Sequence, residues 1–160
     1  MHRYFCCLVL AGLLLACNDN LVFSEYKTTS GGVWNHDEAM VFNFTPPDTL
    51  NRHNMYITIR NDDNYPYSNL FVIATLDFPD GRSLRDTLEY EMALPDGTWM
   101  GKGTGSIKEN KLWYKENIIF PFNGVYTLEL IQAMRKNGSV SGLEALPGIT
   151  DVGLEIEIGK

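Results

Sequence analysis

The sequence predicts an all-β protein, folded as a two-sheet antiparallel β-sandwich of the jelly-roll type. Apolar and polar residues alternate over eight or nine short segments, and turn signals such as Pro-Asp-Gly and Asn-Gly separate them. No segment has a secure helical period. Many short strands with frequent turns pack as two sheets face to face. The strand number favours a jelly roll, with an immunoglobulin-like sandwich as the alternative.

Residues 1–16 are expected to be a leader of the lipoprotein signal-peptide type, which is removed. Its apolar run, Phe5 to Leu15, suits a signal peptide and is too short to cross a bilayer, which needs about 20 residues. Leu14 and Ala16 stand three positions and one position before Cys17, which resembles the bacterial lipobox. There the cysteine sulfur takes a diacylglyceryl group and the chain is cut before it. We therefore expect lipidation of Cys17; an ordinary secretory signal with a chance cysteine is the alternative.

Charge and cysteine content narrow the range of functions. Of the 13 basic and 20 acidic side chains, the leader removes Arg3 alone, which leaves a net charge of −8. Nucleic-acid binding and electrostatic docking on anionic lipid both need clustered basic residues and are disfavoured. Cys6 and Cys7 leave with the leader, so Cys17 has no partner for an intrachain disulfide. Stability must therefore come from a hydrophobic core.

The mature chain reads as a short tether followed by one domain. Residues 17–25 are expected to be the lipid-anchored tether, leading into a first edge strand. Residues 26–160 are expected to form a single β-sandwich domain, because no linker is long enough to separate a second one. Alternating apolar residues such as Phe42 and Phe44 then predict a strand near 38–45, which Pro46 and Pro47 end.

The middle of the chain contains three predicted strands. Met55, Ile57 and Ile59 alternate with polar neighbours and predict a half-buried strand. Residues 70–78 are apolar on both faces, as in a central strand. A Pro-Asp-Gly turn then returns the chain antiparallel over residues 83–94, where a strand is favoured over a helix because tight turns lie on both sides.

The last third of the chain adds four predicted strands. A strand bulged by its glycines comes first, and the Asn-Gly pair at 123–124 predicts a hairpin between the next two. A long loop precedes the final strand, in which apolar residues alternate with Gly and Glu. In order, these segments are strand 98–105, strand 111–122, strand 125–134, loop 135–147 and strand 152–158.

Residue types that carry chemistry occur without the spacing that chemistry needs. His36 and His53 have no partners at metal-ligand spacing and are expected to be loop or surface histidines. Glu155 and Glu157 alternate along the last strand and are expected to face solvent. We therefore expect no catalytic residues, no metal and no cofactor, and we expect the protein not to be an enzyme.

Aromatic residues near turns suggest a contact surface. Tyr65, Tyr67 and Asn69 lie in a predicted loop, and Trp99 opens a glycine-rich segment. An exposed aromatic platform there would suit a protein or glycan partner, since interface hot spots favour Tyr and Trp. The alternative is that these side chains belong to the core and its rim.

An ordered set of short motifs resembles the gliding-motility lipoprotein GldH family over essentially the whole chain. The set follows the lipobox and consists of Arg60-Asn61, Tyr65-Pro66-Tyr67-Ser68-Asn69-Leu70, Asp86-Thr87, Gly97-Thr98-Trp99-Met100-Gly101-Lys102-Gly103, Gly124-Val125-Tyr126, Gln132-Ala133-Met134-Arg135 and Asp151-Val152-Gly153-Leu154. The resemblance implies a non-enzymatic envelope lipoprotein that acts by protein–protein binding. It would be a structural or assembly component of the gliding-motility and associated protein-secretion machinery.

The resemblance also implies a location, a set of partners and a modification. The protein should be lipid-anchored in the outer membrane and face the periplasm, with cell-surface exposure as the alternative. Its partners should be the membrane, through Cys17, and other envelope lipoproteins or secretion and motility components, with no nucleic acid or small-molecule substrate. A membrane-tethered carbohydrate-binding module is the alternative function. Thr49 and Thr87 follow Asp and precede Leu, an O-glycosylation pattern used in the envelope of bacteria that carry this family; the alternative is that they are ordinary turn or strand threonines.

Overall fold

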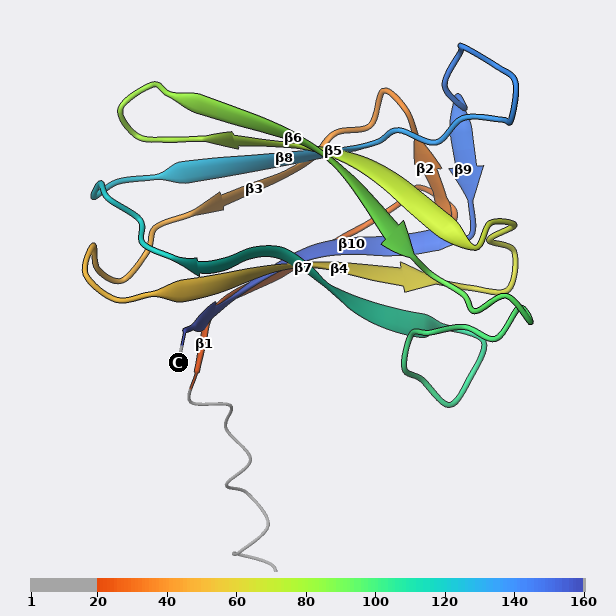
Figure 1. The fold of residues 1–160 in the computed structure, drawn as a ribbon, viewed down its shortest axis with the longest axis horizontal. Helices are drawn as coiled ribbons and strands as arrows, with labels where there is room; N and C mark the ends of the chain where they lie inside the picture. Colours follow the sequence, from red (N-terminus) through yellow and green to blue (C-terminus); the bar gives the residue numbers. More distant parts are fainter. Residues whose placement is uncertain (1–19, 160) are drawn as a thin grey trace, which may run out of the picture.

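The computed structural model describes residues 20–159, which form ten strands and no helix (Figure 1). The all-β prediction is therefore confirmed. In chain order, the strands are β1 (Leu21–Thr28), β2 (Val33–Asn35), β3 (Met40–Phe44), β4 (His53–Asn61), β5 (Asn69–Asp77), β6 (Ser83–Glu91), β7 (Lys108–Ile118), β8 (Tyr126–Gln132), β9 (Ala145–Pro147) and β10 (Ile149–Ile158).

Eight strands form two four-stranded antiparallel sheets that pack face to face (Figure 1). Sheet I has the order β1-β10-β4-β7, and sheet II has the order β3-β8-β5-β6. The β5–β6 hairpin is the innermost pair, and β4–β7, β3–β8 and β1–β10 pair around it in nested succession. Such nesting arises when one long antiparallel hairpin is rolled into two sheets, which is the jelly roll. The predicted jelly-roll-like sandwich is confirmed over the immunoglobulin-like alternative.

Alternation along the strands places the core between the two sheets. Trp34, on β2, is fully buried, and its indole N–H donates to the Glu38 carbonyl at 2.9 Å. Phe44, Phe120 and Tyr126 form an aromatic cluster with ring centroids 5.0–5.6 Å apart. The inward-facing aliphatic residues are Met55, Ile57 and Ile59 of β4, Leu70, Val72, Ala74 and Leu76 of β5, Leu128 and Leu130 of β8, and Val152, Leu154 and Ile156 of β10.

The strands run between two ends of the sandwich, which we call the tether end and the distal end. Leu21 pairs with Glu157, and His53 pairs with Ile158, so β1 enters and β10 leaves at the tether end. Asn61 pairs with Ile149 at the distal end. Because β10 has ten residues and a strand rises about 3.3 Å per residue, the two ends are about 30 Å apart.

The first strand begins earlier than the sequence indicates. The segment 17–25 was expected to be tether, but β1 starts at Leu21 and pairs with β10 through Thr28. The tether prediction is therefore wrong from residue 21 onward. Tyr26 and the half-buried Phe23 anchor this edge strand, and Phe23 contacts Phe44 across the sandwich with ring centroids 5.7 Å apart.

Two predictions for the glycine-containing segments are also wrong. Residues 98–105 form no strand; Trp99 and Lys102 make only isolated bridges, because glycines there leave few side chains to bury. The Asn-Gly pair at 123–124 joins no hairpin, since β7 lies in sheet I and β8 in sheet II. The connection between β7 and β8 instead crosses from sheet I to sheet II, with Phe120 buried between the two sheets.

The predicted loop 135–147 contains a strand. Its last residues form β9, which pairs with β2 as a separate two-stranded sheet at the distal end. Three-residue strands are too short for alternation to reveal. The remaining predicted strands, including 83–94 as β6, correspond to observed strands with shifted ends.

Candidate functional site

A groove of about 780 Å³ lies on the outer face of sheet II, toward the distal end. Phe71 and Ile73 point into it because they alternate along β5 with the buried Leu70 and Val72. Its other lining residues are Pro66, Tyr67, Ser68, Asn69, Thr87, Ala133, Met134, Arg135, Lys136, Asn137 and Gly138. The groove thus combines an apolar floor from β5 with polar loop residues.

The structure brings the four predicted contact residues together beside this groove. The Tyr65 ring lies 5.8 Å from the Tyr67 ring and 6.2 Å from the Trp99 ring, measured between centroids. Tyr67 and Asn69 line the groove, whereas Trp99 does not. Tyr67 and Trp99 are half-buried, so each keeps ring area for a partner.

Tyr65 cannot serve as a contact residue, because it belongs to the core. Its side chain is 3% exposed, and its hydroxyl donates to the Asn69 carbonyl at 2.6 Å. Burial raises the pKa of this hydroxyl, which keeps it a neutral donor. The Asn69 amide donates to the Glu89 carboxylate at 2.9 Å, and this bond holds the Asn69 side chain at the edge of the groove. The prediction for Tyr65 was wrong because an aromatic in a loop can turn inward and pin that loop.

Close backbone packing holds the 61–69 loop in one position. Gly148 has φ +82° and lies so near Tyr65 that a Cβ there would overlap the Tyr65 backbone nitrogen. The Asp62 N–H donates to the Gly148 carbonyl at 2.9 Å, and the Asp62 carboxylate accepts from the Asn64 N–H at 2.8 Å. Tyr67 is therefore displayed on a well-supported loop.

The groove lining is basic in an acidic protein. Arg135 and Lys136 line it, and no lining residue is acidic, although the chain as a whole carries a net charge of −7. Glu89 is the nearby carboxylate that the Asn69 amide engages. The position of these basic residues favours a partner that presents acidic groups.

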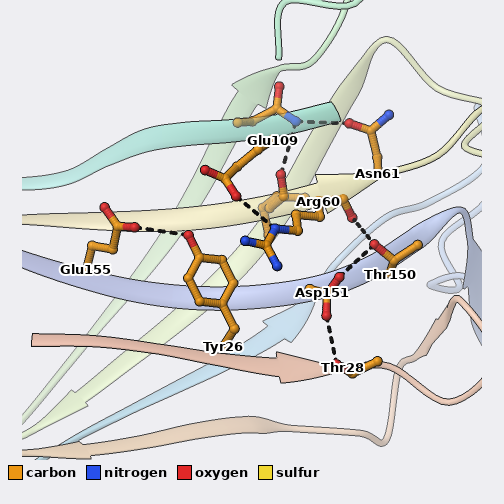
Figure 2. Close-up of polar contacts among 10 residues, drawn as sticks. Tyr26, Thr28, Arg60, Asn61, Glu109, Thr150, Asp151 and Glu155 are labelled. Atoms are coloured by element: carbon orange, nitrogen blue, oxygen red, sulfur yellow. Dashed lines mark hydrogen bonds and ion pairs between the residues drawn. The ribbon is translucent and has the colours of Figure 1, made fainter. Parts of the chain in front are cut away.

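A second group of polar residues covers the outer face of sheet I (Figure 2). The Arg60 guanidinium pairs with Glu109 at 2.8 Å and lies 4.2 Å from the centre of the Tyr26 ring. The Tyr26 hydroxyl donates to Glu155 at 3.0 Å, and burial raises the pKa of that hydroxyl. Asp151 accepts from Thr28 and Thr150 at 2.7 Å and 2.9 Å.

Ion pairs also join the strands within this second group. Lys111 bridges Glu155 and Glu157 at 2.8 Å and 2.7 Å, and the two carboxylate side chains are 16% and 18% exposed. They were expected to face solvent freely, yet both are engaged. Each of these carboxylates thus holds a partner on β7, across the intervening strand β4 of sheet I.

The other predicted positions are scattered. Thr87 lines the groove, whereas Thr49 is half-buried in the connection between β3 and β4 at the tether end. His36 is exposed. His53 is fully buried against the Phe120 ring, which makes the loop-or-surface prediction for it wrong. Cys17 lies outside the described residues. Thr49 and Thr87 stay predicted glycosylation sites.

The sequence contains a partial signal for the groove residues that were missed. The predicted central strand 70–78 is apolar on both faces, and its outward Phe71 and Ile73 form the floor. Arg135 and Lys136 follow β8 in a segment that has no periodicity. Only the folded chain shows that these basic residues stand beside Tyr67.

Within residues 20–159 there is no group of three or more His, Cys, Asp or Glu side chains that could hold a metal ion. The same residues include no helix long and apolar enough to cross a membrane.

Comparisons with known proteins place the chain among its relatives. A family model described as GldH lipoprotein matches residues 21–156. A gliding motility lipoprotein GldH homolog of Christiangramia forsetii is 45% identical over 145 residues, 91% of this chain and 88% of the relative. The gliding motility lipoprotein GldH of Flavobacterium johnsoniae is 45% identical over 150 residues, 94% of this chain and 92% of the relative. The VP2 subviral particle of infectious bursal disease virus gives a TM-score of 0.39 at 12% identity, over 88% of this chain and 30% of that one, a likeness too weak to carry an argument.

Proposed function

The chain belongs to the GldH lipoprotein family, and from this premise we propose that it is a non-enzymatic assembly component of the gliding-motility machinery. It works by binding other envelope lipoproteins or components of the associated protein-secretion machinery. Its anchor is the acylated Cys17, in an outer membrane whose periplasmic side the domain faces. The names of the two relatives support the role in motility, and the family description supports a lipid-anchored place in the cell envelope.

The distal groove is the observation that carries the binding role. It offers apolar area from Phe71 and Ile73, an aromatic side chain from Tyr67, and positive charge from Arg135 and Lys136. Protein interfaces combine such an apolar centre with aromatic and Arg anchors. The carboxylates of the sheet I layer, in contrast, are already engaged.

Crosslinking in intact cells, followed by recovery of the acylated protein from membranes, tests this function. Discrete protein partners in stoichiometric amounts are the expected result. Retention of the purified protein on envelope polysaccharide, without protein partners, would instead support the carbohydrate-binding alternative.

Replacing Tyr67 with alanine should weaken partner binding by about 2 kcal/mol, or roughly thirtyfold in Kd, because hot-spot aromatics contribute on that scale. The melting temperature should fall only modestly, since Tyr67 is half-buried and its ring packs against Tyr65 from one side only. Quantitative recovery of crosslinked partner measures the first quantity and thermal unfolding the second. The same two measurements on Trp99→Ala test whether the neighbouring Trp99 ring also contributes to partner binding.

Trp113→Ala is the matched control, because Trp113 is 52% exposed on sheet I and does not line the groove. It should leave partner recovery intact. If Tyr67→Ala lowers the melting temperature strongly, and recovery falls only as the domain unfolds, Tyr67 is a packing residue.

A further inference from the structure

Exposed apolar side chains gather at the tether end of the sandwich. Leu50 and Val125 are 82% and 58% exposed, and Leu21, Ile119 and Ile158 are between 42% and 44% exposed. They come from strands β1 and β10 and from the connections that precede β4 and follow β7. Other large apolar side chains, including Met100, Trp113 and Val140, are exposed elsewhere on the domain.

Strand register places these residues at the same end. Leu21 pairs with Glu157, next to Ile158, and His53 pairs with both Ile158 and Ile118. Figure 1 shows the connections 45–52 and 119–125 at this end, together with the start of β1. The patch defined by Leu21, Leu50, Ile119, Val125 and Ile158 is called the tether-end patch below.

The length of the tether determines what can cover this patch. Cys17 stands four positions before Leu21, and an extended chain spans at most about 3.6 Å per residue. An acylated Cys17 therefore holds Leu21 within about 14 Å of the lipid that contains its acyl chains. The tether end is therefore the end of the domain that the anchor holds nearest to the bilayer.

The charged groups at this end include the exposed carboxylates of Asp77 and Glu116 and several groups that are held by partners. The Asp48 carboxylate accepts from the backbone N–H groups of Asn51 and Leu50 at 2.6 Å and 2.8 Å; these bonds lower its pKa, so it stays ionised and is held within its own loop. Asp80 pairs with Arg82 at 2.6 Å. Exposed Arg52 donates to the Asn117 carbonyl at 2.9 Å, and a long arginine side chain can keep its charge among headgroups while its stem contacts apolar surface.

We propose that the tether-end patch docks on the lipid surface, with Leu50 and Val125 inserted into the interfacial layer of the bilayer. The recognition is apolar and does not depend on anionic lipid, in keeping with the acidic chain. Docking sets the strands upright on the membrane, with the distal end of the sandwich about 30 Å above it; the groove extends from that end to Ile73 in the middle of β5. The inference rests on acylation at Cys17 and is independent of which partner the groove binds.

Site-directed spin labelling of the full acylated protein tests the docking. The mature chain has Cys17 as its one cysteine, so a nitroxide on Leu50→Cys or Val125→Cys has a unique position once mass spectrometry confirms acylation. The control is Val140→Cys, which is 90% exposed at the distal end. Each variant is reconstituted into phosphatidylcholine and phosphatidylethanolamine vesicles.

Labels at 50 and 125 should lose collisions with a water-soluble nickel reagent and gain collisions with oxygen, which concentrates in lipid, relative to the label at 140. Equal access of nickel to all three labels would overturn the proposal. Because partner binding does not enter this measurement, failure here leaves the proposed function standing.

Discussion

Replacing Gly153 with alanine is expected to lower the free energy of unfolding by about 3 kcal/mol, the upper range for an overpacked site. A Cβ there would overlap the Thr58 hydroxyl oxygen and would lie 2.8 Å from the Tyr26 ring and 3.0 Å from the Glu25 carbonyl oxygen. The Glu25 backbone on β1 cannot move away without a cost in free energy, so the pairing of β1 with β10 must shift.

The absence of a side chain at Gly153 lets the Tyr26 ring lie directly over the sheet. Tyr26 pairs with Gly153 across β1 and β10, and its hydroxyl reaches Glu155 while Arg60 stacks on its ring. Figure 2 shows Tyr26 at the centre of this layer. A strand glycine covered by a cross-strand aromatic is a known way to stabilise a sheet.

Urea unfolding of the variant beside Gly105→Ala measures this effect. A Cβ at Gly105 would meet no other atom within 4 Å, and the φ of Gly105 lies outside the left-handed region, so alanine there should leave stability nearly unchanged. Equal unfolding midpoints for the two variants would show that the packing around Gly153 is looser than described.

Replacing Cys17 with serine is expected to release the protein from the membrane almost completely. Each buried methylene of an acyl chain contributes about 0.8 kcal/mol to membrane binding, so loss of two or three chains removes far more than the tether-end patch could supply. Fractionation of cells, with intact mass of the membrane-bound form, measures both anchoring and acylation.

A Thr28→Ala variant, changed on the exposed end of β1, serves as the control and should stay in the membrane fraction. Membrane retention of the serine variant with an unshifted mass would contradict lipidation at Cys17.

The sequence predicts most of the jelly roll because its signals are local. The alternation of Val152, Leu154 and Ile156 against Glu155 and Gly153 identifies β10 directly. The Pro-Asp-Gly turn identifies the β5–β6 hairpin, from which the other pairs nest outward. Local pattern and final pairing agree wherever neighbouring strands are also consecutive in the chain.

The missed features depend on contacts between distant segments. β2 and β9 are three residues each and lie more than 100 residues apart, so only their pairing reveals them. The Asn-Gly pair at 123–124 has ordinary hairpin chemistry, but the nested pairing of β7 with β4 takes the two neighbouring strands into different sheets. Tyr65 likewise turns inward because Gly148 packs against its backbone.

The candidate site was predictable only in part, because some of its residues come from segments that are distant in the chain. Tyr67 and Asn69 were identified by residue type and loop position, and both line the groove. Arg135 and Lys136 join them only because the end of β8 lies beside β5 in sheet II. Charge in a segment without periodicity gives no sign of what it will face.

Site-specific photocrosslinking in living cells tests the central claim, that the distal groove is the surface that binds a protein partner. A photoreactive phenylalanine analogue replaces Tyr67 in the groove or Trp113 on the outer face of sheet I. We expect a discrete adduct with an envelope protein from position 67 and none from position 113. An adduct from position 113 alone would place the binding surface on sheet I and contradict the assignment of the groove.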